Sequence, residues 1–235
     1  EQNRGLKLKV YDIKLLKTAH IECFDSVLYK NGQSEKATTI GCHCFLLQNN
    51  NTYYLIDTGI DDVDIANKTK SSTDDWKCGV DECNVKENLE KLGVSCDKIT
   101  KDFLTHSHYD HISGVKYFEN AEFYMTSAEY ELLYSEENHL KEYLKEAKEF
   151  LKNKKIVLFD NEYEVDGIKL KLRGGHTKGS MTVETGNILF SGDTIFVQNN
   201  LREKIPSGFT QDREASDSIL LDYLSYNGKI ITSHD

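Results

Sequence analysis

Four side chains that can bind a metal ion fall within the segment T-H-S-H-Y-D-H, at positions 105–111. They are His106, His108, Asp110 and His111. Imidazole and carboxylate groups are ligands that borderline and hard divalent ions prefer. Alternation along an extended backbone lets His106 and His108 point the same way, and Asp110 and His111 follow at a turn. One ion rarely takes four ligands from so short a segment, so the spacing predicts two ions with two of these ligands each.

Further candidate ligands stand where predicted strands end. Besides His106, the residues at such ends are Asp57, His176, Asp193 and His234. Loops at strand ends allow a rigid scaffold to bring together side chains from distant parts of the sequence. We predict that His106, His108 and His176 bind one ion and that Asp110, His111 and His234 bind the other. Asp193 would bridge both ions, and Asp57 would orient a ligand histidine.

The predicted ligand set also bears on which metal is bound. It contains five imidazoles and two carboxylates. Imidazole suits zinc, and manganese or iron accept the same mixture of nitrogen and oxygen ligands. We therefore predict two divalent metal ions as cofactors, with Zn²⁺ favoured and Mn or Fe as alternatives.

Short strands interspersed with helices connect these positions. Strands are predicted at residues 6–17, 40–47, 53–56, 99–104, 121–125, 156–159, 168–172, 181–184, 187–190 and 229–232. Helices are predicted at residues 84–92, 128–134, 139–151 and 215–224, and another begins within 112–118. Residues 22–39 are predicted to be irregular, and 61–83 a long loop around Trp76. The pattern favours one α/β layered domain over residues 1–235, with 1–5 as a cloning scar or processed start.

Composition narrows the range of partners. A net charge of −10 argues against a nucleic-acid backbone, which needs clustered Lys and Arg. No apolar run approaches the length of a membrane span and no signal peptide opens the chain, so no membrane partner is expected. The six cysteines form no C-x-x-C pair and are expected to be reduced, which favours the cytoplasm, with export of a processed chain as the alternative. The expected partner is a small-molecule substrate, and a dimer is one option for the oligomeric state.

The candidate ligands also match a family pattern. The sequence resembles the metallo-β-lactamase-fold hydrolases, whose H-x-H-x-D-H signature stands here at residues 106–111. The later ligands occur in that superfamily's contexts, Gly175-His176-Thr177, Gly192-Asp193-Thr194 and Ser233-His234-Asp235. Within the superfamily the chain is most similar to the N-acyl homoserine lactonases, through residues 175–180 and 200–208.

This resemblance implies a four-layer αββα sandwich of two mixed β-sheets that holds a dinuclear metal site. It also implies a hydrolase in which a hydroxide bridging two metals attacks the carbonyl carbon of a lactone, ester or thioester. Asp110 would be the catalytic residue that takes or gives the proton as the leaving group departs, besides binding metal.

One position departs from the lactonase pattern. The lactonases most studied place a tyrosine three residues after the bridging aspartate, where its phenol can hydrogen-bond the substrate carbonyl. This chain has Phe196 there, and phenylalanine offers no donor. A metal- or ligand-binding module of the same fold with little turnover therefore stays open as an alternative. A glyoxalase II-like thioesterase that lacks the glutathione domain is another, because residues 192–196 resemble glyoxalase II. Class B β-lactamases fit less well, because they do not bridge their metals with an aspartate such as Asp193.

Overall fold

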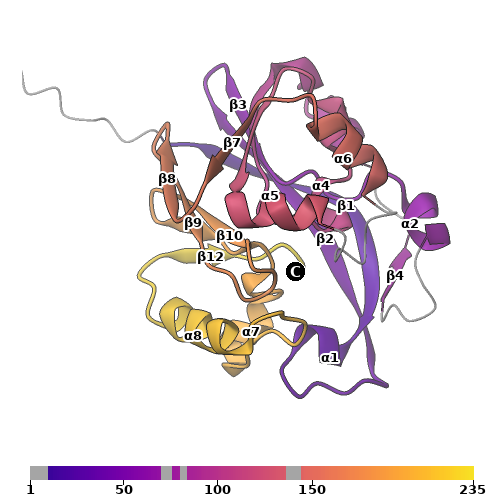
Figure 1. Ribbon diagram of the computed structural model, residues 1–235, viewed down its shortest axis with the longest axis vertical. Helices are drawn as coiled ribbons and strands as arrows, with labels where there is room; N and C mark the ends of the chain where they lie inside the picture. The colour runs from indigo at the N-terminus through magenta and orange to yellow at the C-terminus, as the bar shows by residue number, and fades with distance from the viewer. Residues whose placement is uncertain (1–9, 70–75, 80–83, 136–143) are drawn as a thin grey trace, which may run out of the picture.

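Two β-sheets face each other at the centre of the molecule, and helices cover both outer faces (Figure 1). The structure is a computed structural model that describes residues 10–69, 76–79, 84–135 and 144–235. The predictions for residues 1–5, for the start of the first strand and for residues 139–143 fall outside these ranges.

The first sheet has seven strands in the order β4-β1-β2-β3-β5-β6-β7. Their bounds are β1 Asp12–Phe24, β2 Ala37–Asn49, β3 Thr52–Ile56, β4 Trp76–Gly79, β5 Ile99–Phe103, β6 Glu122–Thr126 and β7 Ile156–Phe159. The pairs from β4 to β3 are antiparallel, and those from β3 to β7 are parallel. The sheet is therefore mixed.

The second sheet has five strands in the order β12-β11-β10-β9-β8. Their bounds are β8 Glu162–Val165, β9 Ile168–Leu172, β10 Met181–Thr185, β11 Ile188–Phe190 and β12 Lys229–Ile231. Only the β11–β12 pair among them is parallel, so this sheet is mixed as well.

The helices lie in the connections between strands. Their bounds are α1 Asp25–Leu28, α2 Val63–Thr69, α3 Val85–Lys91, α4 Tyr109–Ile112, α5 Ser127–Tyr134, α6 Lys145–Leu151, α7 Gln198–Glu203 and α8 Arg213–Leu224. Short 3₁₀ turns occupy Cys96–Lys98, Val115–Tyr117 and Gly192–Thr194. No helix in the described ranges is long and apolar enough to cross a membrane.

Three apolar layers hold the elements together. Along β2, Cys44 and Leu46 face a core shared with α3 to α6, whereas Phe45 faces a core between the sheets. The second sheet contributes residues such as Leu170 and Val183 to that central core. Its opposite face packs on α8 through residues such as Leu189, Ile219 and Leu220. Successive side chains of a strand point to opposite faces, so three cores separate four layers. The predicted αββα sandwich is confirmed.

Two regions predicted to be irregular contain regular structure. Within 61–83, Asp62 caps α2 by accepting the Ile65 amide at 2.8 Å, and β4 pairs with β1. Within 22–39, β1 continues to Phe24, which pairs with Ala37 at the start of β2. The prediction failed because backbone pairing holds these segments in place, and polar sequences leave no hydrophobic period to reveal it.

The other element predictions differ mainly in their bounds. The helix expected within 112–118 is split into α4 and a 3₁₀ turn at Val115–Tyr117. The strand β8 was not predicted, because it is an edge strand whose side chains are mostly exposed. The helix α7 was not predicted either, since its six residues are too few to show a helical period.

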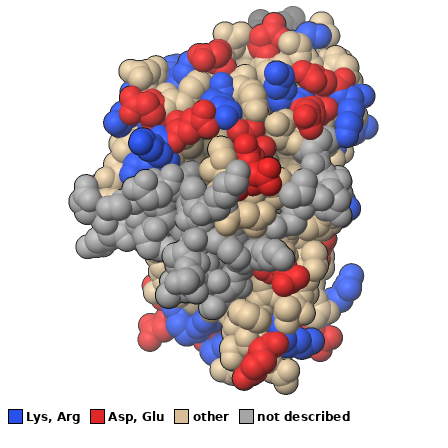
Figure 2. Space-filling model, turned by 90° about the vertical axis from the view of Figure 1, so that its right-hand side faces the viewer, with Lys and Arg blue, Asp and Glu red and all other residues tan. Residues whose placement is uncertain are grey.

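Charges of both signs are interspersed on the face shown in Figure 2, where blue and red side chains alternate outside the grey region. The whole chain contains 39 acidic and 29 basic residues. The described part of that face therefore offers no concentrated basic surface of the kind that phosphate backbones require.

Asp102 on β5 is a buried carboxyl group without a hydrogen-bond partner among the described residues. It pairs in register with Leu55 and Phe123, which belong to the core beneath the helices. Burial, with a smaller contribution from the charge of Asp57, raises its pKa well above the usual range. The neutral acid is therefore the form that the fold accommodates.

We predict that Asp102→Leu stabilises the protein. An unpartnered buried polar group costs about 1–3 kcal/mol, so the free energy of unfolding should rise by that order. Because the folded pKa is raised, stability is lost as pH increases through it, and the gain on substitution should be larger at pH 8 than at pH 5.5. Urea unfolding at both pH values measures this, and a gain that does not change with pH would contradict it.

Candidate metal centre

The segment 105–111 leaves the first sheet at the end of β5. His106 and His108 follow the strand, and Asp110 and His111 lie in α4, where the His111 amide donates to the His108 carbonyl at 3.0 Å. The Met181 amide donates to the Thr105 carbonyl at 2.9 Å and so ties this segment to the second sheet. The candidate ligands of the segment are thus anchored to both sheets.

The other three candidate ligands come from the second sheet. His176 follows β9, Asp193 lies in the 3₁₀ turn after β11, and His234 follows β12. Gly175, just before His176, has a φ of 80°, in the left-handed region that favours glycine. All seven predicted ligands are therefore placed by the ends of strands, as the sequence indicated.

The seven side chains form two groups in space. One group is His106, His108 and His176, and the other is Asp110, His111, Asp193 and His234. Within each group the candidate ligand atoms all lie within 4.8 Å of one another. The geometry thus brings together the residues that the sequence assigned to each ion, and their role as metal ligands stays a prediction.

Asp193 lies between the two groups. Its Oδ2 is 3.7 Å from His106 Nε2 and 3.6 Å from His176 Nε2. Its Oδ1 is 3.2 Å from His111 Nε2 and 3.0 Å from His234 Nε2. One oxygen therefore faces each group, which is the arrangement that a bridging carboxylate requires.

Buried atoms that lack hydrogen bonds indicate that the residues fit metal ions. The Nε2 atoms of His106, His111 and His234 and the Oδ1 atom of Asp193 are buried and make no hydrogen bond of good geometry to the described residues. Buried polar groups are nearly always satisfied, so four such atoms pointing into one space call for a partner of another kind. A divalent cation coordinated by imidazole and carboxylate supplies it.

The electrostatic environment differs between the groups. Burial, reinforced by the nearby His111, lowers the pKa of His106 well below its usual value. The pKa values of His111 and His234 are raised. Burial alone would lower them, but the negative charge of Asp193, assisted by that of Asp110, has the larger effect. Burial also lowers the pKa of His176. His106 and His176 therefore present neutral imidazole, the form that binds metal, and the second group is richer in negative charge.

Asp57 fixes the orientation of His111, as the sequence predicted. Its Oδ2 is 2.8 Å from His111 Nδ1 and also accepts the Thr105 hydroxyl at 2.7 Å. Its Oδ1 accepts the Thr105 amide at 2.7 Å. Asp57 has a φ of 60°, an unusual conformation for a residue other than glycine, and such backbone strain concentrates at functional sites.

Main-chain carbonyls hold two other imidazoles. His234 Nδ1 donates to the Gly41 carbonyl at 2.8 Å, and His176 Nδ1 donates to the Phe209 carbonyl at 3.1 Å. A histidine that donates through Nδ1 presents Nε2 as the ligand atom. In both residues Nε2 is the atom that faces Asp193.

Two phenylalanine rings border the candidate ligands. Phe196 is buried between the groups, stacked on His234 at 5.5 Å and edge-on to His176 at 5.2 Å between ring centroids. Phe209 stacks on His108 at 6.0 Å and is 43% exposed. The sequence singled out Phe196 but gave no sign of Phe209, which follows a glycine in a segment without periodicity.

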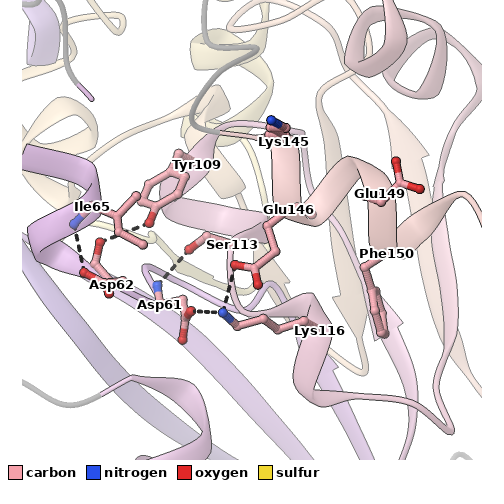
Figure 3. A pocket seen from close by; sticks show the side chains of 11 residues that line it. Asp61, Asp62, Ile65, Tyr109, Ser113, Lys116, Lys145, Glu146, Glu149 and Phe150 are labelled. Carbon is pink, nitrogen blue, oxygen red and sulfur yellow. Dashed lines mark hydrogen bonds and ion pairs between the residues drawn. The ribbon is translucent and has the colours of Figure 1, made fainter. Parts of the chain in front are cut away.

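The hydroxyl of Tyr109 does not take the place of the hydroxyl that is missing at Phe196. The Tyr109 hydroxyl donates to the Asp62 carbonyl at 3.0 Å. The Tyr109 side chain lines a pocket of about 580 Å³ that is bounded by residues of α2, α4 and α6 (Figure 3). The pocket lining mixes apolar side chains such as Ile65 and Phe150 with the charged side chains labelled in the figure. A binding space thus adjoins the residue between His108 and Asp110.

Glu129 also lies at the site and was not predicted. Its carboxylate is buried and binds Ser107 and Thr177, which neighbour candidate ligands. The sequence carries Thr126 and Glu129 at the spacing of a helix capping box, and Thr126 does cap α5 by accepting the Glu129 amide at 3.1 Å. That pattern would have assigned Glu129 to helix capping.

Comparison with known proteins identifies the family. Residues 37–232 match the Metallo-beta-lactamase superfamily. The chain belongs to this superfamily. An N-acyl homoserine lactonase from Bacillus sp. is 28% identical over 181 residues, which cover 72% of this chain and 70% of that protein.

Solved structures share the fold. The chain is similar to a mutant of B. thuringiensis AiiA with N-decanoyl-L-homoserine bound at the active site, with a TM-score of 0.83 and 20% identity over 97% of this chain and 94% of that one. It is also similar to AidC, a dizinc quorum-quenching lactonase in complex with a product, N-hexanoyl-L-homoserine, with a TM-score of 0.72 and 19% identity over 97% and 89% of the two chains. The predicted resemblance and the class of metal-dependent, lactonase-like hydrolase are confirmed.

We predict that Asp57→Asn lowers the affinity for one metal ion about 10- to 100-fold. This is the usual effect of removing the hydrogen-bond partner of a metal-binding histidine. Asparagine tolerates the left-handed backbone of residue 57, so the change acts on the bond to His111 rather than on the chain path. Titration of metal-free protein with Zn²⁺ against a competing chelator measures it. Equal weakening of both ions would contradict an effect local to His111.

Proposed function

We propose that the protein is a dinuclear metal-dependent hydrolase that opens the carbonyl of a lactone, ester or thioester. The observation that carries this proposal is the placement of Asp193, with one carboxylate oxygen facing each ligand group. We propose His106, His108 and His176 as ligands of one ion. Asp110, His111 and His234 would bind the other, Asp193 would bridge both, and zinc is the favoured metal because five ligands are imidazoles.

The ions, when bound, supply a nucleophile at neutral pH and polarise the substrate carbonyl. The chain's own residues hold the geometry and move the proton. Asp110 suits proton transfer because its side chain is 20% exposed, and its Oδ2 is 3.6 Å from His111 Nε2 and 3.7 Å from His234 Nε2. It therefore lies close to the candidate ligands and is partly open to solvent, so it can hand a proton to the leaving oxygen or sulfur.

The surroundings of the site bear on the substrate. The exposed ring of Phe209 offers an apolar contact beside His108. We propose that the remainder of the substrate enters the pocket beside Tyr109, whose lining includes Lys145, Glu146 and Glu149 (Figure 3). Charged side chains disfavour burial of a long hydrocarbon, so a short or polar acyl group should be preferred over a decanoyl chain.

The proposed location is the cytoplasm. Cys23 and Cys44 are buried and free in the structure, and burial raises the pKa of the Cys23 thiol to about 12. Buried reduced thiols are usual in a reducing compartment. Detection of the native protein in a cytosolic fraction tests this.

We predict that His106→Ala and Asp193→Ala each abolish turnover together with tight metal binding. The experiment measures hydrolysis of a panel of hexanoyl and decanoyl homoserine lactones, short polar lactones, thioesters and phosphodiesters by zinc-loaded protein. The panel separates lactonase from thioesterase, the activity expected of a glyoxalase II-like enzyme. Full turnover by a metal-free variant would contradict the proposal.

We predict that Phe196→Tyr raises kcat for lactones about tenfold. A well-placed donor to the developing oxyanion is worth about 10²–10³ in kcat, and the ring at position 196 already lies between His176 and His234. Phe196→Leu is the control, because it changes packing without adding a donor. An equal change in both variants would show that the hydroxyl has no part in the effect.

A metal-binding module with little turnover is the second candidate, and the missing donor at Phe196 is what favours it. Two tightly bound ions without hydrolysis of any substrate in the panel would establish it.

A further inference from the structure

Glu129 is a buried carboxylate that the proposed reaction does not use. It lies in the first turn of α5, on the helical layer above the first sheet, and its side chain is fully enclosed. An acidic side chain is almost never fully buried unless it is paired, so its partners indicate its role.

The first partner is Ser107, which lies between His106 and His108. Glu129 Oε1 accepts the Ser107 amide at 2.7 Å and the Ser107 hydroxyl at 2.5 Å. Two bonds to one residue fix both the backbone and the side chain at that point. The two histidines on either side of Ser107 are therefore held by a single carboxylate oxygen.

The second partner is Thr177, which follows His176. Glu129 Oε2 accepts the Thr177 hydroxyl at 2.5 Å. The chain beyond it touches α5 directly, because a side chain on Gly179 would lie 2.2 Å from the Glu129 backbone nitrogen, and the Thr126 hydroxyl donates to the Gly179 carbonyl at 2.7 Å. The loop from the second sheet is thus fastened to the same helix turn.

We propose that Glu129 is the positioning residue that sets the spacing of His106, His108 and His176. One carboxylate oxygen binds the segment from the first sheet, and the other binds the loop from the second sheet. Each oxygen binds a residue adjacent to a candidate ligand. The inference rests on the proposed dinuclear site. It assigns Glu129 to one ion only, because its partners Ser107 and Thr177 are adjacent in the chain to ligands of the three-histidine group and to none of the other group.

The test is titration of metal-free, full-length protein with Zn²⁺ against a competing chelator, with Co²⁺ absorption as a second readout. In Glu129→Leu one of two equivalents should bind about 10- to 100-fold more weakly, while the other is unchanged. Glu129→Gln keeps an acceptor for Ser107 but loses the carboxylate that receives the Thr177 hydroxyl, so its effect should be smaller and in the same direction.

Two variants, each lacking one candidate ligand, show which ion Glu129 affects. In His234→Ala, where the three-histidine group is intact, adding Glu129→Gln or Glu129→Leu should weaken the remaining equivalent. In His176→Ala, where that group is already broken, the same change should leave the remaining equivalent as it was. Non-additivity of this kind is the sign of a direct coupling.

Leu133→Ala is the matched control, because Leu133 is a fully buried apolar residue on the same helix. It should lower thermal stability without selective loss of one ion. The inference is wrong if Glu129→Gln keeps both equivalents at wild-type affinity, if both weaken equally, or if Leu133→Ala gives the same selective loss. Wild-type protein that binds two ions but hydrolyses nothing would contradict the proposed function alone.

Discussion

The buried negative charge of Asp193 is the constraint on which the rest of the site depends. An ionised carboxylate in the interior costs several kcal/mol unless it is paired, and Asp193 is only 3% exposed. His234 and His111, whose own pKa values are raised, lie 3.0 and 3.2 Å from its Oδ1 and hold the pKa of Asp193 well below the usual range despite burial. Strand ends from both sheets converge because this carboxylate and the buried imidazoles must be satisfied together.

Buried carboxylates outside the two groups of candidate ligands also hold the site in place. Asp57 and Glu129 are both buried, and both bind the segment 105–111. Asp57 contacts His111 directly and reaches His106 through the Thr105 hydroxyl, whereas Glu129 binds residues that neighbour the three-histidine group. Neither side chain reaches solvent, so the positions of the imidazoles are set by packing and hydrogen bonds in the folded chain. Such pre-organisation limits the entropy that must be lost when a ligand binds.

The candidate ligands, including those from distant strand ends such as His176 and His234, could be predicted from the sequence, but several other contacts between distant segments could not. The spacing within 105–111 and the strand before it are properties of adjacent residues, so the candidate ligands of this segment and β5 followed from inspection. The strand β4 exists through its backbone pairing with β1, and Glu129 binds residues 22 and 48 positions away. Phe209 lies beside His108 only because the chain returns there between β11 and β12. No short-range pattern carries such information.

The division of candidate ligands between the sheets has a consequence for how long the protein survives. Four come from the first sheet and three from the second, across a boundary otherwise filled by side chains such as Phe45 and Phe190. Ions held by all seven residues would therefore join the two sheets. A ligand that binds only the native state stabilises it by mass action. In metal-starved cells the sheets would part more readily at this edge, and proteases would remove the chain. Metal supply would then govern the abundance of the protein as well as its activity.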